Sequence, residues 1–215
     1  MSVIDIGGEV REGEELDIGA VENWLKNQGV ELVGPAVVTQ YTDGASNWTY
    51  RLKYENTDLI LRRPPKGTKA KSAHDMAREY MVQKNLAPYY PVLPKMVALC
   101  QDESVIGCDF YVMERIEGII PRAKLPPELR FNEEDVHQLC VNVLDKLIEL
   151  HQVPYENTPL AELGKGTGYC RRQVEGWDKR YEKVRTLNVP SFKYVRKWLK
   201  DNVPQDSTTC IIHND

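Results

Sequence analysis

The sequence predicts an α+β protein with two lobes, the first mainly antiparallel β-sheet and the second mainly helical. Three short runs of β-forming residues follow one another after Pro35, and two more follow the next helical segment. From residue 132 onward the apolar residues recur at helical spacing instead. A mostly β part followed by a mostly α part is typical of α+β architectures.

The first part is expected to alternate helices with strands. Asp17 is the predicted N-cap of a helix that runs through Leu25, and a second helix is expected from Ser72, with Asp75 in a capping-box-like position. The expected strands cover residues 36–41, 48–54, 59–62, 96–101 and 110–115. The close spacing of the first three in the chain favours an antiparallel meander.

The second part is expected to contain three main helices and one strand. Asn132 precedes a segment whose apolar residues lie at offsets 0, 3, 4, 7, 8, 11 and 12 from Val136, which match one face of a helix. Further helices are expected over residues 171–184 and 192–202. The apolar run 210–213 is interpreted as a short buried strand.

Composition suggests where the domains divide. Residues 1–16 are rich in Gly and Glu and are expected to form a flexible segment. Gly118 and the proline-containing stretch 121–127 separate the strand-rich region from the helical one. We therefore expect a first lobe over residues 17–118 and a partial helical lobe over 119–215.

Charge and composition exclude several classes of protein. Hydrophobic residues make up 41% and charged residues 28% of the 215 residues, as in ordinary globular proteins. The net charge of −4 gives no general attraction to nucleic acid or to an anionic membrane. The five cysteines form no Cys-x-x-Cys pair, so no zinc site is expected. Without a signal peptide or a long apolar run, we expect a cytoplasmic protein.

Two candidate binding features lie in the first part. The polar turn 42–47 contains Gly44 and Ser46 and can place N–H groups and a hydroxyl against phosphate oxygens, although an ordinary hairpin loop is the alternative. Arg62 ends an apolar strand and needs an anion, which is either a nucleotide phosphate or a carboxylate. The basic residues that follow are interpreted as a solvated loop: Arg63, Lys66, Lys69 and Lys71.

Two carboxylates complete the set of candidates. Glu79 falls within the apolar face of its helix, where an unpaired charge is costly, so Arg62 is its candidate partner; an edge position open to water is the alternative. Asp215 ends a His-x-Asp sequence after the last expected strand. This sequence begins the catalytic loop of kinases, in which the Asp deprotonates the acceptor hydroxyl, although a polar loop is the alternative.

These features occur in the order that kinase-like folds require, and the sequence resembles the aminoglycoside phosphotransferase-like kinases, which share the protein-kinase-like fold. The resemblance extends over residues 17–215. It is carried by GASNWTYRL (44–52), LILRRPP (59–65), Ala73-His74, Arg78-Glu79-Tyr80, Val105-Ile106-Gly107, FYVME (110–114), Glu117-Gly118, Leu150-His151 and IIHND (211–215). The Arg-Arg-Pro-Pro variant is most similar to phosphotransferase domains that occur alone in bacteria or fused to acyl-CoA dehydrogenases.

The resemblance implies a nucleotide site in the first lobe. Arg62 stands where the family's lysine on strand three contacts the phosphates, and Glu79 stands where its helix partner pairs with it. Glu114 and Ile116 fall at the hinge, whose backbone holds the adenine edge. Gly44 and Ser46 would lie against the phosphates.

The resemblance also implies the chemistry of the second lobe. Asp215 would be the catalytic base, and the cofactors would be ATP and Mg²⁺. The kinase pattern places a metal-binding Asn about five residues beyond the Asp and a further Asp later. Metal ligands are therefore expected beyond residue 215, and a chain truncated at the catalytic loop is expected to be inactive by itself.

The predicted function is ATP-dependent transfer of phosphate to a hydroxyl group of a small molecule. The alternatives are a non-catalytic nucleotide- or partner-binding module and an α+β domain of unrelated function. Arg171 and Arg172 open a helix where relatives shape the acceptor pocket. They would suit an anionic acceptor, such as a hydroxyacyl thioester of coenzyme A, although a solvated helix face is the alternative.

Overall fold

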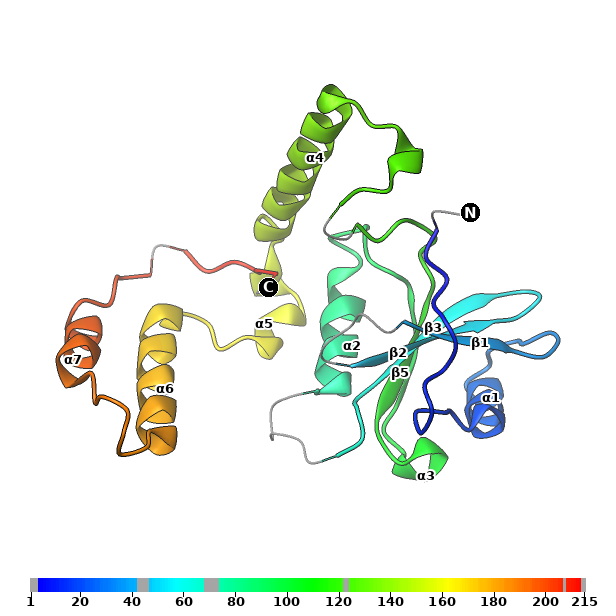
Figure 1. The fold of residues 1–215 in the computed structure, drawn as a ribbon, viewed down its shortest axis with the longest axis horizontal. Helices are drawn as coiled ribbons and strands as arrows, with labels where there is room; N and C mark the ends of the chain where they lie inside the picture. The colour runs from blue at the N-terminus through cyan, green and yellow to red at the C-terminus, as the bar shows by residue number, and fades with distance from the viewer. Residues whose placement is uncertain (1–3, 42–46, 68–73, 122–123, 207, 214–215) are drawn as a thin grey trace. The chain divides into compact units, whose positions relative to one another are not determined.

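The computed structural model describes residues 4–41, 47–67, 74–121, 124–206 and 208–213 (Figure 1). The chain divides into two compact units, residues 1–145 and 146–215. The division falls inside a long helix, rather than at residue 118, where the change of composition suggested a boundary. Each unit is described by itself below.

The first unit is built on a five-stranded sheet with the strand order β1-β2-β3-β5-β4. Every neighbouring pair of strands is antiparallel, as predicted. The strands are β1 (Val37–Tyr41), β2 (Trp48–Lys53), β3 (Asp58–Arg63), β4 (Met96–Cys100) and β5 (Phe110–Glu114). Because β5 lies between β3 and β4, the register places Arg62 of β3 opposite Tyr111 of β5.

The helices also follow the predicted order. They are α1 (Ile18–Asn27), α2 (Met76–Leu86), α3 (Glu103–Ile106), α4 (Glu133–His151), α5 (Leu160–Leu163), α6 (Tyr169–Val184) and α7 (Lys193–Asp201), with short 3₁₀ turns at Pro127–Leu129 and Tyr155–Asn157. The Asp17 carboxylate accepts a hydrogen bond from the Ala20 amide and caps α1. Asn132 and Asp135 cap α4 by exchanging side-chain-to-backbone bonds, which is a capping box.

The start of α2 differs from the prediction. The helix begins at Met76, and Asp75 is its N-cap, accepting a hydrogen bond from the Arg78 amide at 2.8 Å. His74 has a φ of 63°, in the left-handed region, so it cannot belong to the helix. Ser72, the predicted start, lies outside the described residues.

The helices α1 and α2 cover opposite faces of the sheet (Figure 1). Val21 and Leu25 of α1 pack into a core with Leu61 and Phe110, and Trp24 meets Phe110 edge-on at 4.9 Å. Met76 and Tyr80 of α2 pack against Tyr111 on the other face. Because side chains alternate along a strand, neighbouring residues of β3 and β5 point to different helices.

This alternation separates Arg62 from Arg63. Arg62 lies on the α2 face, whereas Arg63 points to the α1 face, where its side chain lies over the rings of Trp48 at 4.7 Å and Tyr50 at 5.9 Å. Arg63 is only 4% exposed. The prediction of a solvated loop at this residue was therefore wrong, because β3 continues through Arg63 and buries it.

The N-terminal segment makes regular contacts with the sheet, whereas composition predicted a flexible segment. Gly8 and Gln40 exchange backbone hydrogen bonds of 2.9 and 3.0 Å. The Tyr50 hydroxyl donates to the Glu14 carbonyl at 2.6 Å, and Val10 and Leu16 pack against the core. The segment therefore lies along β1 and the α1 face of the sheet.

In the second unit, the strand predicted at residues 210–213 does not form. Ile212 is 45% exposed, and none of the described residues pairs with this run as a strand. An apolar run favours a strand only where a neighbour supplies the hydrogen-bonding groups of the ladder. In the described part of the chain, no helix is long and apolar enough to cross a membrane.

Candidate functional site

The centre of the candidate site is an ion pair between β3 and α2. The Nη1 atom of Arg62 lies 3.4 Å from Oε2 of Glu79, and the two side chains are 30% and 33% exposed. Arg62 reaches α2 because β3 presents it on the face that α2 covers. The pairing expected from the position of Glu79 on its helix is therefore confirmed.

Tyr111 of β5 joins both members of this pair. Its hydroxyl donates to Oε2 of Glu79 at 3.1 Å and accepts from Nη1 of Arg62 at 3.1 Å. Nε2 of Gln83 also donates to the Tyr111 hydroxyl oxygen, at 3.3 Å. One hydroxyl supplies one donor and two acceptor sites, so the Tyr111 hydroxyl is fully used.

Burial keeps this hydroxyl protonated. Desolvation raises the pKa of Tyr111 above its ordinary value, and the Arg62 charge opposes this only in part. Tyr111 is fully buried, so its ring also fixes the distance between β5 and α2. The hydroxyl therefore acts as a permanent donor to Glu79.

Asn47 holds the other oxygen of Glu79. Its Nδ2 atom donates to Oε1 of Glu79 at 2.8 Å, and its Oδ1 atom lies 2.7 Å from Nδ1 of His74. Because the amide nitrogen faces the carboxylate, Oδ1 must accept, so Nδ1 of His74 carries the proton. Asn47 is 5% exposed and directly follows residues 42–46 in the chain. It therefore ties the start of β2 to α2.

The arrangement leaves part of Arg62 available for an anion. Its ion pair with Glu79 and its hydrogen bond to Tyr111 both use Nη1. Its Nε atom is buried, with no partner in the described part of the chain. A planar guanidinium held through Nη1 can present the N–H groups of Nη2 to a phosphate in a fixed orientation, whereas the buried Nε cannot be reached by a ligand.

The predicted hinge residues follow β5. The Glu114 amide donates to the Lys95 carbonyl at 2.8 Å, and its carboxylate pairs with Lys95 at 2.8 Å. Ile116 is 60% exposed, and none of the described residues hydrogen-bonds to its backbone. An amide and a carbonyl at a strand end can pair with the edge of a planar base when no other residue hydrogen-bonds to them.

Other predicted site residues lie elsewhere. Gly44, Ser46 and Asp215 fall outside the described residues. In the second unit, Arg171 lies 3.8 Å from Glu175 in an exposed i,i+4 pair. Arg172 donates to the carbonyls of Gly166, at 2.8 Å, and Thr167, so its guanidinium holds the loop before α6.

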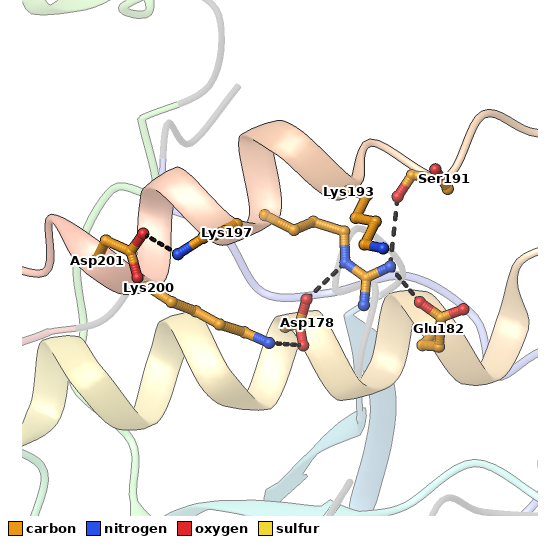
Figure 2. A pocket seen from close by; sticks show the side chains of 8 residues that line it. Asp178, Glu182, Ser191, Lys193, Lys197, Lys200 and Asp201 are labelled. Carbon is orange, nitrogen blue, oxygen red and sulfur yellow. Dashed lines mark hydrogen bonds and ion pairs between the residues drawn. The ribbon is translucent and has the colours of Figure 1, made fainter.

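Between α6 and α7 lies an open pocket of about 550 Å³ lined mainly by charged residues. Arg196 pairs with Asp178 and Glu182, and Lys200 also pairs with Asp178. Figure 2 shows Lys200 reaching Asp178, and Lys197 turned toward Asp201. Most charged side chains of this pocket thus pair with one another. We therefore interpret the pocket as part of the packing between α6 and α7.

Four residues of the site had no individual role predicted: Asn47, which lies in the polar turn 42–47, and His74, Gln83 and Tyr111. Strand pairing could have found Tyr111, because β5 lies beside β3 and the residue opposite Arg62 must share its face. Asn47 gave a weaker signal as a polar residue at the start of a strand. Nothing in the linear pattern indicated that His74 would face Asn47.

No group of three or more His, Cys, Asp or Glu residues that could hold a metal ion occurs among the described residues. All five cysteines are free, and Cys100 is buried. The described part of the site is therefore a hydrogen-bonded cation and carboxylate cluster without a metal-binding group.

An antiparallel sheet with an arginine on β3 paired to a glutamate on the following helix has the arrangement of kinase-like α+β folds, in which a cation on strand three pairs with a glutamate on the next helix. The chain belongs to the Phosphotransferase enzyme family, whose sequence profile matches residues 37–215. The predicted family and fold class are thereby confirmed.

Curated relatives include acyl-CoA dehydrogenase family member 11 of Gallus gallus, which is 35% identical over 213 residues. Acyl-CoA dehydrogenase family member 10 of Mus musculus is 33% identical over 207 residues. The alignments cover 96% of this chain but only 27% and 19% of the two relatives, so the chain spans about a quarter or less of their length.

Two solved structures resemble the chain. A Ralstonia eutropha protein provisionally assigned as an aminoglycoside phosphotransferase aligns with a TM-score of 0.68 and 30% identity, covering 89% of this chain and 55% of that one. A type I macrolide 2′-phosphotransferase aligns with a TM-score of 0.56 and 17% identity, covering 96% and 66%. The second likeness shows the fold alone.

Proposed function

We propose that this chain carries the nucleotide-binding part of an ATP-dependent phosphotransferase that acts on a hydroxyl group of a small molecule. The observation that carries the proposal is the Arg62–Glu79 pair, held by Tyr111 and Asn47 with part of the guanidinium left over. A cation fixed in this way suits the β- and α-phosphates of a nucleotide.

In this proposal two groups of residues in the first unit bind different parts of the nucleotide. Arg62 binds the phosphates, and Glu79 holds Arg62 in place. Gly44 and Ser46 lie against the phosphates, and the backbone at Glu114 and Ile116 binds the adenine edge. The exposure of Ile116 and the absence of a backbone partner among the described residues support the second assignment.

Asp215 is proposed as the catalytic base that takes the proton of the acceptor hydroxyl. Mg²⁺, when bound, neutralises charge on the phosphates in reactions of this class. The described residues contain no group suited to hold it, so none of them is assigned to the metal. Binding of a small anionic acceptor by Arg171 and Arg172 stays a prediction, which the contacts of Arg172 do not favour.

The nucleotide site is tested by titrating the protein with ATP and with adenosine in a calorimeter. We expect Arg62→Ala to weaken ATP binding about tenfold or more, the effect of losing one hydrogen bond to a charged group. Adenosine binding should not change, because adenosine has no phosphates. Lys53→Ala, which removes an exposed cation from the same sheet, is the matched control.

Two results would contradict this assignment. If the wild-type protein binds no nucleotide at millimolar concentrations, the proposed function is wrong. If Arg62→Ala binds ATP as tightly as the wild type, Arg62 has no role at the phosphates. The role of Asp215 is tested by phosphate transfer in the longest natural form of the protein, where Asp215→Asn should abolish transfer without weakening ATP binding.

A further inference from the structure

A buried arginine lies directly beside the proposed adenine-binding backbone. Arg115 follows β5, between Glu114 and Ile116, and its side chain is only 4% exposed. A buried guanidinium is stable only when its N–H groups find acceptors. The acceptors of Arg115 therefore show what fixes this segment.

The partners of Arg115 come from separate parts of the first unit. Nη1 donates to Oδ2 of Asp58 at 3.2 Å and lies 3.6 Å from Oε2 of Glu117. Nε donates to the Tyr41 hydroxyl at 3.3 Å, and Nη2 donates to the Asp5 carbonyl at 2.8 Å. One side chain thus joins β1, β3 and the N-terminal segment at the end of β5.

Asp58 anchors Arg115 a second time. Its backbone carbonyl accepts a hydrogen bond of 2.9 Å from the Arg115 amide. Its carboxylate also accepts two bonds from Arg51, at 2.8 and 2.7 Å. Although burial alone would raise the pKa of Asp58, the hydrogen bonds from Arg51 and the charges of Arg51 and Arg115 lower it. Asp58 is therefore a stable anion, and it fixes one side of Arg115.

The other side of Arg115 depends on residues 4–8, which we call the N-terminal strap. The Asp5 carbonyl accepts from Arg115 and also from the Tyr41 hydroxyl, at 3.3 Å. Gly8 pairs with Gln40 of β1, which holds the strap against the sheet. The strap thus supplies the main-chain oxygen that completes the surroundings of Arg115.

We propose that Arg115 is a positioning residue for the nucleotide, and that docking of the N-terminal strap on Arg115 sets the orientation of the hinge backbone. The inference rests on the proposed function, because it assigns the adenine edge to the backbone beside Arg115. It adds that residues 4–8, which are far in the sequence from the proposed phosphate-binding residues, control nucleotide affinity through the Arg115 side chain.

The first test compares nucleotide affinities of Arg115→Ala and Arg115→Lys with the wild type. Both variants should weaken the binding of ATP and of adenosine by the same factor, about tenfold, because the hinge contacts the base that both ligands share. Lysine keeps the charge but lacks the planar fork that reaches three acceptors, so it should not restore binding. Melting curves identify any variant that fails to fold. If Arg115→Ala does not fold, Arg115→Lys is used for the comparison.

The second test moves the strap without touching the hinge. Gly7 has a φ of 76°, and a Cβ there would lie 2.9 Å from the Gln40 carbonyl oxygen, so Gly7→Ala should displace the strap. Gly13 has a φ of 80° with nothing within 4 Å, so Gly13→Ala has the same backbone strain without the contact. We expect Gly7→Ala, and not Gly13→Ala, to weaken adenosine binding about threefold or more.

The combination of both changes decides the mechanism. If the strap acts through Arg115, Gly7→Ala should have no further effect in the Arg115→Ala background, because coupled residues are not additive. Additive effects, or Arg115 variants that fold and bind adenosine normally, would overturn the inference. Failure of the wild type to bind nucleotide would instead reject the proposed function, and the inference with it.

Discussion

Nη1 of Arg62 on β3 and Oε2 of Glu79 on α2 lie 3.4 Å apart, and both atoms also contact the hydroxyl of Tyr111. The pair is about one-third exposed, so it lies at the edge of the core and not inside it. An ion pair with this exposure contributes little to folding stability. Its main effect is to hold the arginine in one orientation.

Glu79→Gln should therefore separate stability from binding. Glutamine keeps the shape and can still accept from Tyr111 with its one oxygen, but its amide nitrogen then faces Nδ2 of Asn47, so the free energy of unfolding should fall by about 1–3 kcal/mol. The affinity for ATP should also fall, because Arg62 loses the negative charge of Glu79 that orients it. Urea denaturation and calorimetry measure the two effects. A loss of stability well above this value with normal ATP affinity would show that Glu79 is mainly structural.

Tyr111→Phe should cost stability, because it removes a hydroxyl that makes three hydrogen bonds in a buried position. Leaving polar partners unsatisfied costs about 1–3 kcal/mol. Denaturation curves should show this loss, whereas Tyr89→Phe, at a position 43% exposed, should be close to neutral. Equal stability of the two variants would mean that water replaces the Tyr111 hydroxyl.

Asn47→Asp should be destabilising in a pH-dependent way. The new carboxylate would face Oε1 of Glu79, where the amide nitrogen now lies at 2.8 Å. Two close carboxylates raise the pKa of one of them, so the folded state takes up a proton. A carboxyl whose folded pKa is raised loses stability as the pH rises, so the variant should be least stable at neutral pH and recover toward pH 5.

The control for this variant is Asn142→Asp. The Asn142 side chain is exposed and accepts a hydrogen bond from Gln138 through its oxygen, which an aspartate can also do. The free energy of unfolding of Asn142→Asp should equal that of the wild type over the whole pH range. If Asn47→Asp behaves in the same way, Asn47 does not contact Glu79 closely in solution.

In the second unit, acid should loosen the contact between α6 and α7. Hydrogen bonds from Arg196 and Lys200 lower the pKa of Asp178 to about 2. Because this folded-state pKa lies below the unfolded value of about 4, its stabilising contribution is present above pH 4 and is lost as the pH falls through about 2. NMR titration of the Asp178 carboxyl should show the low midpoint.

Two substitutions distinguish Asp178 from its neighbours. Asp178→Asn should reduce the acid-dependent change in the α6–α7 contact, and the part that remains should come from Glu182, whose pKa is also lowered by its hydrogen bond from Arg196. Asp201→Asn should leave that change in place, because Asp201 pairs with Lys197 in an exposed i,i+4 pair. A midpoint for Asp178 near its ordinary value would contradict the close contacts with Arg196 and Lys200.

The local elements could be predicted because their signals are local. The caps Asp17 and Asn132 were predicted because they occur where side chains bond to the first amides of a helix. Short runs of β-forming residues gave the five strands to within one or two residues. The carboxylate of Glu79 on an apolar helix face indicated a partner, and Arg62 is that partner.

The errors occurred where a contact between distant segments decides the structure. Arg63 is buried because β3 continues through it and places it over Trp48. Residues 4–16 bond to the sheet although their composition is typical of a loop. Residues 210–213 form no strand, because an apolar run by itself supplies no partner.

The sequence alone thus determined the fold class and the order of the main elements, because periodicity and capping act over a few residues, and the charge of Glu79 on an apolar helix face indicated Arg62 as its partner. Only the tertiary structure decided that Tyr111 and Asn47 hold this pair, and that Arg115 joins the N-terminal strap to the end of β5. Those contacts depend on strand register and on the packing of α2 against the sheet. Residues separated by 32 to 110 positions meet there, and no local pattern encodes the meeting.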